Sequence, residues 1–136
     1  MLVLHFTDGI VQVYVLSSNG KQWIHFGNKM RYGDTTGHLV LSADGSTVAM
    51  SNIFDDIMGN HAGAVRAYRF DTVKGNWTQM GSTDIYGNDA GDKFGNCLSL
   101  SQDGNRLVAG NGLHRNASGL VRVLDWNGKE WVQISK

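Results

Sequence analysis

Asp84–Gly110 reads DIYGNDAGDKFGNCLSLSQDGNRLVAG. The stretch begins as a loop rich in Gly and Asp, continues as an alternating strand around Leu98–Leu100, turns at Asp103-Gly104, and ends in a second strand, Arg106–Gly110. Asp-Gly between two alternating strands predicts a β-hairpin, because both turn positions of such hairpins take positive φ. The stretch therefore predicts a small antiparallel unit preceded by a long loop.

The same unit occurs earlier in the chain, where His38–Met50 places Asp44-Gly45 59 residues before Asp103-Gly104. Three Trp residues recur at intervals of 54 residues, and three Gly residues at intervals of 54 and 56 each open a Gly-x-Val motif. They are Trp23, Trp77 and Trp131, and Gly9, Gly63 and Gly119. Self-similarity at a fixed interval is the signature of a repeat architecture.

Each repeat holds four short strands, which describes a blade of a β-propeller better than a barrel or a sandwich. We expect an all-β fold, because no window has an apolar period of 3.6 residues and Gly interrupts every possible helix. The expected organisation is one domain, 1–136, with a partial blade at 1–27 and blades at 37–81 and 95–134. Residues 28–36 and 82–94 are expected to be inter-blade loops.

The expected number of blades, about two and a half, is too small for a closed ring, since propellers typically have four to eight. Leu2–Phe6 is expected to be a strand of the partial blade. We expect the chain to be a segment of a longer propeller or to complete one by self-association, and two copies would supply five blades. Each of the three repeated Trp residues is expected to fill the same inter-blade position, because a ligand would need only one of them.

Composition excludes some functions. The formal net charge is zero, with 12 basic and 12 acidic residues, which removes the electrostatic argument for nucleic acid as a partner. No apolar run approaches the ~18 residues of a membrane span, and Met1–Phe6 lacks the basic start of a signal peptide.

The single cysteine, Cys97, permits no internal disulfide. Its place beside Leu98 on an inner strand predicts a buried, inert thiol.

The pattern of the second copy resembles FG-GAP-type repeats, the blades of integrin-α-like β-propellers. Phe94-Gly95 corresponds to the FG element, and Ala109-Gly110 to most of the GAP element. The Gly-Leu-Val-Arg-Val run from Gly119 completes the likeness. The resemblance implies a β-propeller of the kind found in secreted and cell-surface proteins, so we expect an extracellular or secretory-pathway location.

The first copy departs from this pattern, with Thr36-Gly37 in place of Phe-Gly and Met50-Ser51 in place of Ala-Gly. Many integrin-type blades also carry a calcium loop, Asp-x-Asp-x-Asp-Gly. This chain retains only the Asp-Gly pairs of its two turns. A calcium ion takes six to eight oxygen ligands, so calcium binding does not carry over, and we assign no metal and no cofactor.

The long loops are expected at one end of the blades, because loops after strands two and four emerge on the same side. Function in rigid β scaffolds usually lies on such loops. The ligand-face candidates on them are Asp55, Asp56, His61, Asp89, Asp92 and His114. For the carboxylates near Asp89 we favour Asx turns over a cation site, and for those near Asp55 we favour a solvated loop. Asn116 begins a glycosylation sequon in the last long loop.

The five histidines show no zinc-binding spacing, and no Cys-His-Asn arrangement can be assembled. We therefore assign no catalytic residue and expect no enzymatic activity. The leading hypothesis is a non-enzymatic β-propeller module for protein or glycan recognition, with the long loops as its ligand face. The alternatives are a structural subunit that completes a propeller or assembly through its open sheet faces, and a fragment of a larger propeller enzyme.

Overall fold

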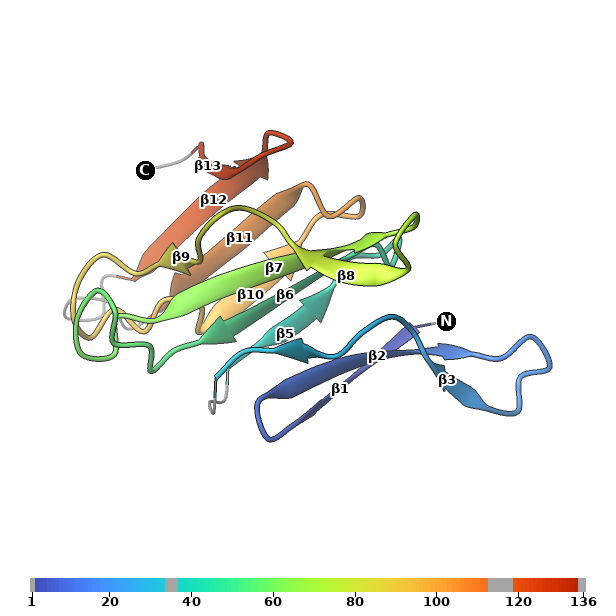
Figure 1. The fold of residues 1–136 in the computed structure, drawn as a ribbon. Coiled ribbons are helices and arrows are strands. Elements are labelled where there is room, and N and C mark those ends of the chain that lie inside the picture. The colour runs from blue at the N-terminus through green and yellow to red at the C-terminus, as the bar shows by residue number, and fades with distance from the viewer. Residues whose placement is uncertain (1, 34–36, 113–118, 135–136) are drawn as a thin grey trace.

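The described part of the chain is built from three antiparallel β-sheets that lie one against the next (Figure 1). The computed structural model describes residues 2–33, 37–112 and 119–134. All the regular secondary structure in these residues is β-strand, which confirms the all-β prediction, and none of the sheets closes on itself. Within the described ranges, no helix has the length and apolar character to cross a bilayer.

The second and third sheets have the same design, a meander of four strands. The second contains β5 (Leu39–Leu41), β6 (Thr47–Asn52), β7 (Ala64–Asp71) and β8 (Asn76–Gln79). The third contains β10 (Cys97–Leu100), β11 (Arg106–Asn111), β12 (Leu120–Trp126) and β13 (Trp131–Gln133). These strands lie where the repeat predicted them.

The ladder registers correct one detail of the sequence alignment. Leu39 pairs with Met50 as Leu98 pairs with Ala109, so Leu39 and Leu98 are equivalent. Gly37 therefore corresponds to Asn96, one residue away from the Phe-Gly match that the motif suggested.

The first sheet has the last three strands of the same meander. They are β1 (Leu2–Thr7), β2 (Ile10–Leu16) and β3 (Trp23–His25). The turn between β1 and β2 places Asp8 and Gly9 at positive φ, 48° and 73°. Two consecutive residues in the left-handed region are what a two-residue hairpin requires.

Two short strands were not predicted, because both fall in stretches expected to be loops. β4 (Met30–Arg31) pairs with the start of β2, and β9 (Ile85–Tyr86) pairs with the start of β7. Each follows a Gly at positive φ, Gly27 at 78° and Gly81 at 93°. After the last strand of the meander, β3 or β8, the chain thus turns at a Gly and pairs again with the same partner, β2 or β7. Met30 of β4 is buried in the core.

The Asp-Gly turns also differ from the expected two-residue hairpin. Gly104 has φ 68°, whereas Asp103 is not among the residues with positive φ. The hydroxyl of Ser101 donates to Asp103 Oδ1 (2.6 Å) and accepts the N–H of Arg106 (2.9 Å), which closes a wider loop. The Ser101 hydroxyl, together with the N–H of Asn105, holds the pKa of Asp103 at about 2. Ser42 and Asp44 repeat this arrangement in the second sheet.

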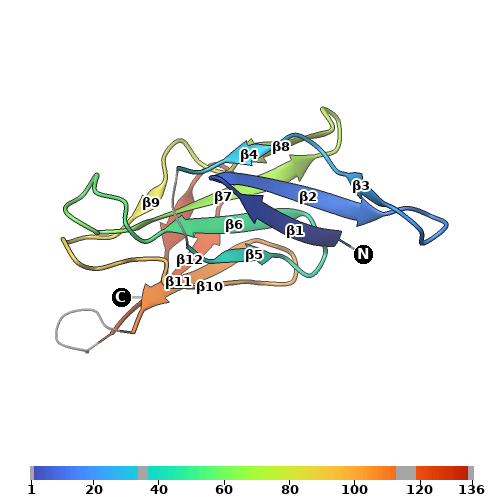
Figure 2. The ribbon, with the colours of Figure 1, turned by 90° about the horizontal axis from the view of Figure 1, so that it is seen from below.

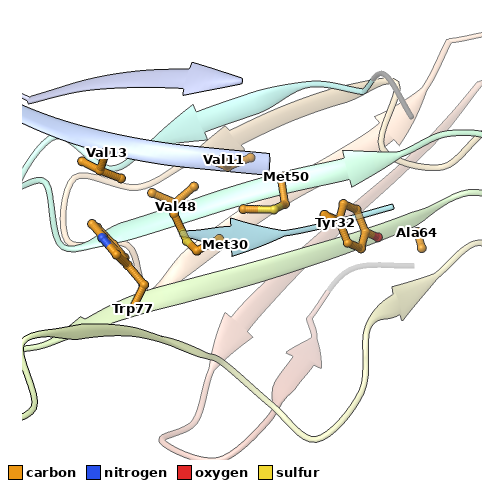
Figure 3. Packing of buried hydrophobic residues seen from close by; sticks show 8 residues of the cluster. All are labelled: Val11, Val13, Met30, Tyr32, Val48, Met50, Ala64 and Trp77. Carbon is orange, nitrogen blue, oxygen red and sulfur yellow. The ribbon is translucent and has the colours of Figure 1, made fainter. Parts of the chain in front are cut away.

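The core lies between the sheets. Figure 3 shows Val11 and Val13 of β2 facing Val48 and Met50 of β6, which join the first sheet to the second. A second cluster, which includes Val65, Ala67, Leu107 and Phe94, joins the second sheet to the third. Burial of apolar side chains between flat faces is therefore what holds the three sheets together.

Both interfaces also contain the same polar contact. Arg66 of β7 donates from Nη1 to the carbonyl of Arg31 in β4 (3.4 Å), and Arg122 of β12 donates from Nη1 to the carbonyl of Tyr86 in β9 (2.6 Å). Each Arg lies three residues after the Gly of a Gly-x-Val motif. The repeat thus includes an Arg that binds a backbone carbonyl of the preceding sheet.

Gly104 is a sensitive position at the second interface. A Cβ placed there would overlap the side chain of Thr47, whereas a Cβ at Gly20, which has nearly the same φ (69° against 68°), meets nothing within 4 Å. We expect Gly104→Ala to lower the free energy of unfolding by about 3 kcal/mol, from backbone strain plus overpacking. Gly20→Ala should cost about 1 kcal/mol, the strain alone.

Urea denaturation of both variants checks this prediction. The difference between the two free energies isolates the contact with Thr47, because the backbone conformations match. Equal losses would show that strain alone acts at Gly104.

Candidate functional site

The long loops gather at one end of the sheets, as the topology predicted. Figures 1 and 2 show the loop after β6 and the loop after β9 together at the left end, whereas the tight turns within the second and third sheets lie at the opposite end. We call the two loops, residues 53–62 and 87–95, the paired loops. His114 and Asn116 lie outside the described residues.

Backbone hydrogen bonds join the paired loops. The N–H of Gly91 donates to the carbonyl of Asn60 (2.8 Å), that of Lys93 to His61 (2.9 Å), and that of Phe94 to Ala62 (2.9 Å). Residues that are about 30 positions apart in the sequence are thereby held in one surface.

The acidic candidates of the first paired loop shape its backbone. Asp55 Oδ1 accepts the N–H of Ile57 (3.0 Å), and Asp56 Oδ1 accepts the N–H of His61 (2.7 Å). His61 has φ 56°, a conformation that an L-residue adopts at a cost. These carboxylates thus fix the backbone of a loop whose side chains are largely exposed.

Three apolar side chains project from this loop. Phe54 is 39% exposed, Ile57 68% and Met58 52%. The ring of His61 packs edge to face against Phe54, with centroids 5.1 Å apart. Sequence reasoning did not single out these three residues, because residue type alone does not show which apolar side chains of a loop remain exposed.

In the second paired loop, Asp92 is buried and Asp89 is exposed. Asp92 Oδ2 accepts the N–H of Asn88 (3.0 Å) and the N–H of Asp89 (2.9 Å). The side chain of Asn111 donates to the Asp92 carbonyl (2.7 Å), which ties the loop to β11. Asp92 therefore fixes the backbone of its loop by accepting from residues three and four positions before it, whereas the Asx turn favoured from the sequence would accept from the residue two positions after it.

We expect Asp92→Ala to lower the free energy of unfolding by about 2–4 kcal/mol, because it leaves two inward backbone N–H groups without an acceptor. Asp92→Asn retains an acceptor oxygen and should cost about half as much or less. Chemical denaturation measures both values. If the two variants lose equal stability, the negative charge rather than the acceptor geometry is what matters.

A charged cluster that the sequence did not reveal lies beneath the paired loops. Arg66 Nε donates to Asp84 Oδ1 (2.6 Å) and Nη2 to Oδ2 (2.9 Å), and the guanidinium lies 4.8 Å from the centroid of the Tyr32 ring. Burial, followed by the charge of Asp84, raises the pKa of Tyr32 well above its usual range. Asp84 thus belongs to this cluster and not to the turn that Asp92 fixes.

The Tyr32 hydroxyl is buried and has no hydrogen-bond partner among the described residues. The Tyr32 ring lines a cavity of about 80 Å³ between the first two sheets, together with Val11, Leu39 and Met50. Ligand pockets usually measure about 300–1,000 Å³, so this cavity is a packing defect rather than a small-molecule site.

The three repeated Trp residues have different surroundings. Trp77 is 3% exposed and donates its indole N–H to the carbonyl of Phe26 (2.9 Å), which places it between the first two sheets. Trp131 packs against the second core cluster. Trp23, expected in an equivalent inter-blade position, is instead 46% exposed, because no described sheet covers that face of the first sheet.

Cys97 also differs from its prediction, since its side chain is exposed. Leu98 and Leu100 contact the second core cluster, and strand alternation therefore turns Cys97 to the opposite face. That face has no neighbouring sheet among the described residues.

The described residues contain no group of three His, Cys, Asp or Glu side chains that could hold a metal ion. A comparison of the chain with protein-family models and with curated proteins finds no match. Function must therefore be argued from the geometry of the paired loops and of the sheet faces.

Proposed function

We propose that this chain is a run of FG-GAP-type β-propeller blades that acts as a non-enzymatic recognition module in the extracellular space or the secretory pathway. The motif pattern around Phe94-Gly95 supports the family, and the common design of the second and third sheets supports the blade. The innermost strands also support a radial arrangement, because β10 lies against β5 and β6.

The proposed ligand is a protein, and the proposed contact surface is the pair of loops. The observation that carries this proposal is the exposure of Phe54, Ile57 and Met58 on a loop whose backbone is fixed by Asp55 and Asp56. Apolar and aromatic side chains in a preorganised loop supply contact area at little cost in conformational entropy. A glycan would require hydrogen-bonding side chains in the same position, and Phe54, Ile57 and Met58 offer none.

A peptide library displayed on phage, selected against the chain, tests the proposal. The peptides should lose affinity by about tenfold or more for the triple variant Phe54→Ser, Ile57→Ser, Met58→Ser. Val73→Ser is the matched control, because Val73 is 95% exposed in the turn between β7 and β8, at the other end of the sheet. It should leave the affinity unchanged.

The same variants on a glycan array separate the two ligand classes. Peptides that bind the triple variant as tightly as the unchanged chain would contradict the paired loops as the binding surface. Glycan binding that survives the triple substitution would contradict a protein ligand.

A further inference from the structure

Two sheet faces at opposite ends of the stack are uncovered in the described structure. Val11 and Val13 face the second sheet, so alternation turns Gln12 and Tyr14 outward, and the ladders place His25 and Trp23 beside them. We call these four residues the first-sheet outer face. On the third sheet, Leu124 is buried and pairs with Leu107 of the second core cluster, so it faces inward and alternation turns Val121 outward.

The third-sheet outer face comprises Cys97, Val108, Val121, Val132 and Ile134. Val121, Val132 and Ile134 are each about half exposed. The charged residues on this face satisfy each other, because Arg106 Nε donates to Asp125 Oδ1 (2.6 Å) and Nη2 to Oδ2 (2.8 Å). A partner face that carries no Asp, Glu, Lys or Arg can therefore cover it without leaving an unpaired charge.

The two interfaces within the chain show which kind of surface packs against a face in the position of the third-sheet outer face. In each, the Trp-bearing face of one sheet packs on the opposite face of the preceding sheet, with Trp77 in the first cluster and Trp131 beside the second. Both also carry the Arg-to-carbonyl bond made by Arg66 and Arg122. The sheets thus stack front to back, in one direction, along the chain.

Trp23 occupies the position of Trp77 in the first sheet. It pairs with Leu16 of β2 as Trp77 pairs with Phe70 of β7. The first-sheet outer face is therefore equivalent in position to the faces that are already buried in the second and third sheets, with Gln12 where those faces carry Arg66 and Arg122. Its polar side chains are partly satisfied among themselves, since the Tyr14 hydroxyl donates to Gln12 Oε1 (3.2 Å).

We propose that a second copy of this chain associates head to tail, with its first-sheet outer face packed on the third-sheet outer face of the first copy. The front-to-back stacking inside the chain supports this occupant, because the two end faces are related as the two sides of an internal interface. The contact is heterologous, so each copy uses a different face. Trp23 of one copy then covers the valines of the other, and Cys97 lies under the interface.

Two variants, each blocked at one end, test the proposal. Trp23→Lys places a charge on the first-sheet outer face, and Val121→Lys places one on the third-sheet outer face. Both positions are exposed in the single chain, so the substitutions should not disturb its fold, while a buried lysine opposes association. The shared positive sign prevents the two new side chains from pairing.

In sedimentation equilibrium, the unchanged chain should self-associate and each variant alone should remain a monomer. An equimolar mixture of the two variants should form a 1:1 dimer, because each supplies the one face that the other has lost. A chain that remains monomeric up to about 1 mM would overturn the proposal. So would a variant that still dimerises alone, since that indicates a symmetric contact or a different surface.

Cys97 supplies an independent readout. Alkylation of its thiol by iodoacetamide should slow as the concentration of the unchanged chain rises, and should not slow for Trp23→Lys. Circular dichroism establishes that each variant is folded, and the milder pair Trp23→Ser and Val121→Ser replaces any variant that is not. The triple loop variant should associate normally, so failure of the recognition proposal and failure of this one remain distinguishable.

Discussion

Replacement of Trp77 by Ala should lower the free energy of unfolding by about 3–5 kcal/mol, the range for truncation of a buried Trp. The ring is 3% exposed and contacts Phe26 and Phe70, with centroids 6.2 Å and 5.3 Å away. Its indole N–H donates to Phe26 in the preceding sheet. The substitution would leave a cavity between two sheets and remove the donor to the carbonyl of Phe26.

Trp23→Ala is the matched control, because it removes the same side chain from the equivalent position of the first sheet. Trp23 is 46% exposed, and its loss should change stability by less than about 1 kcal/mol in dilute solution. Urea denaturation at low protein concentration measures both. Similar losses for the two variants would mean that a Trp contributes equally to the free energy of unfolding whether or not a neighbouring sheet covers it.

Asp84→Ala should be the second most damaging change, at about 3 kcal/mol. The Asp84 side chain is 6% exposed and that of Arg66 27%. The hydrogen bonds that Arg66 donates to Asp84 raise the pKa of Arg66, so the guanidinium stays charged at any accessible pH. Removal of the carboxylate would leave this charge without its partner against the Tyr32 ring, and an unpaired buried charge is strongly destabilising.

The pair Arg106–Asp125 provides the control, because its Nε to Oδ1 distance is also 2.6 Å and its side chains are more exposed, at 55% and 38%. Exposed ion pairs contribute about 0–1 kcal/mol, so Asp125→Ala should have little effect. A double-mutant cycle on each pair separates the pairwise energy from the other consequences of truncation. Equal coupling energies would contradict the importance of burial.

Much of the strand order follows from the sequence, since the meanders of the second and third sheets lie where the Trp, Gly-x-Val and Asp-Gly repeats predicted them. The repeat could not predict β4 and β9. Each has only two residues, and each follows a Gly of the kind that usually marks the end of a strand region and the start of a loop. Their pairing depends on a partner strand about 20 residues earlier in the chain.

The candidate site was predictable in position rather than in detail. Topology placed the long loops at one end, whereas the exposed tip of Phe54, Ile57 and Met58 depends on how the loop backbone turns. The pair Arg66–Asp84 joins residues 18 positions apart through side chains alone, and such a contact leaves no periodic signal. Cys97 was assigned to the wrong face because its neighbour Leu98 is apolar, although alternation separates the two.

The Arg-to-carbonyl bonds of Arg66 and Arg122 have a consequence for local opening. Each links a sheet only to the sheet before it, so the second sheet is held from both sides, and the first and third from one side each. In stacked repeats, stability is the sum of the units and their nearest-neighbour interfaces. Amide hydrogens of β6 and β7 should therefore exchange with solvent more slowly than those of β2 and β12, and openings should begin at the two ends of the stack.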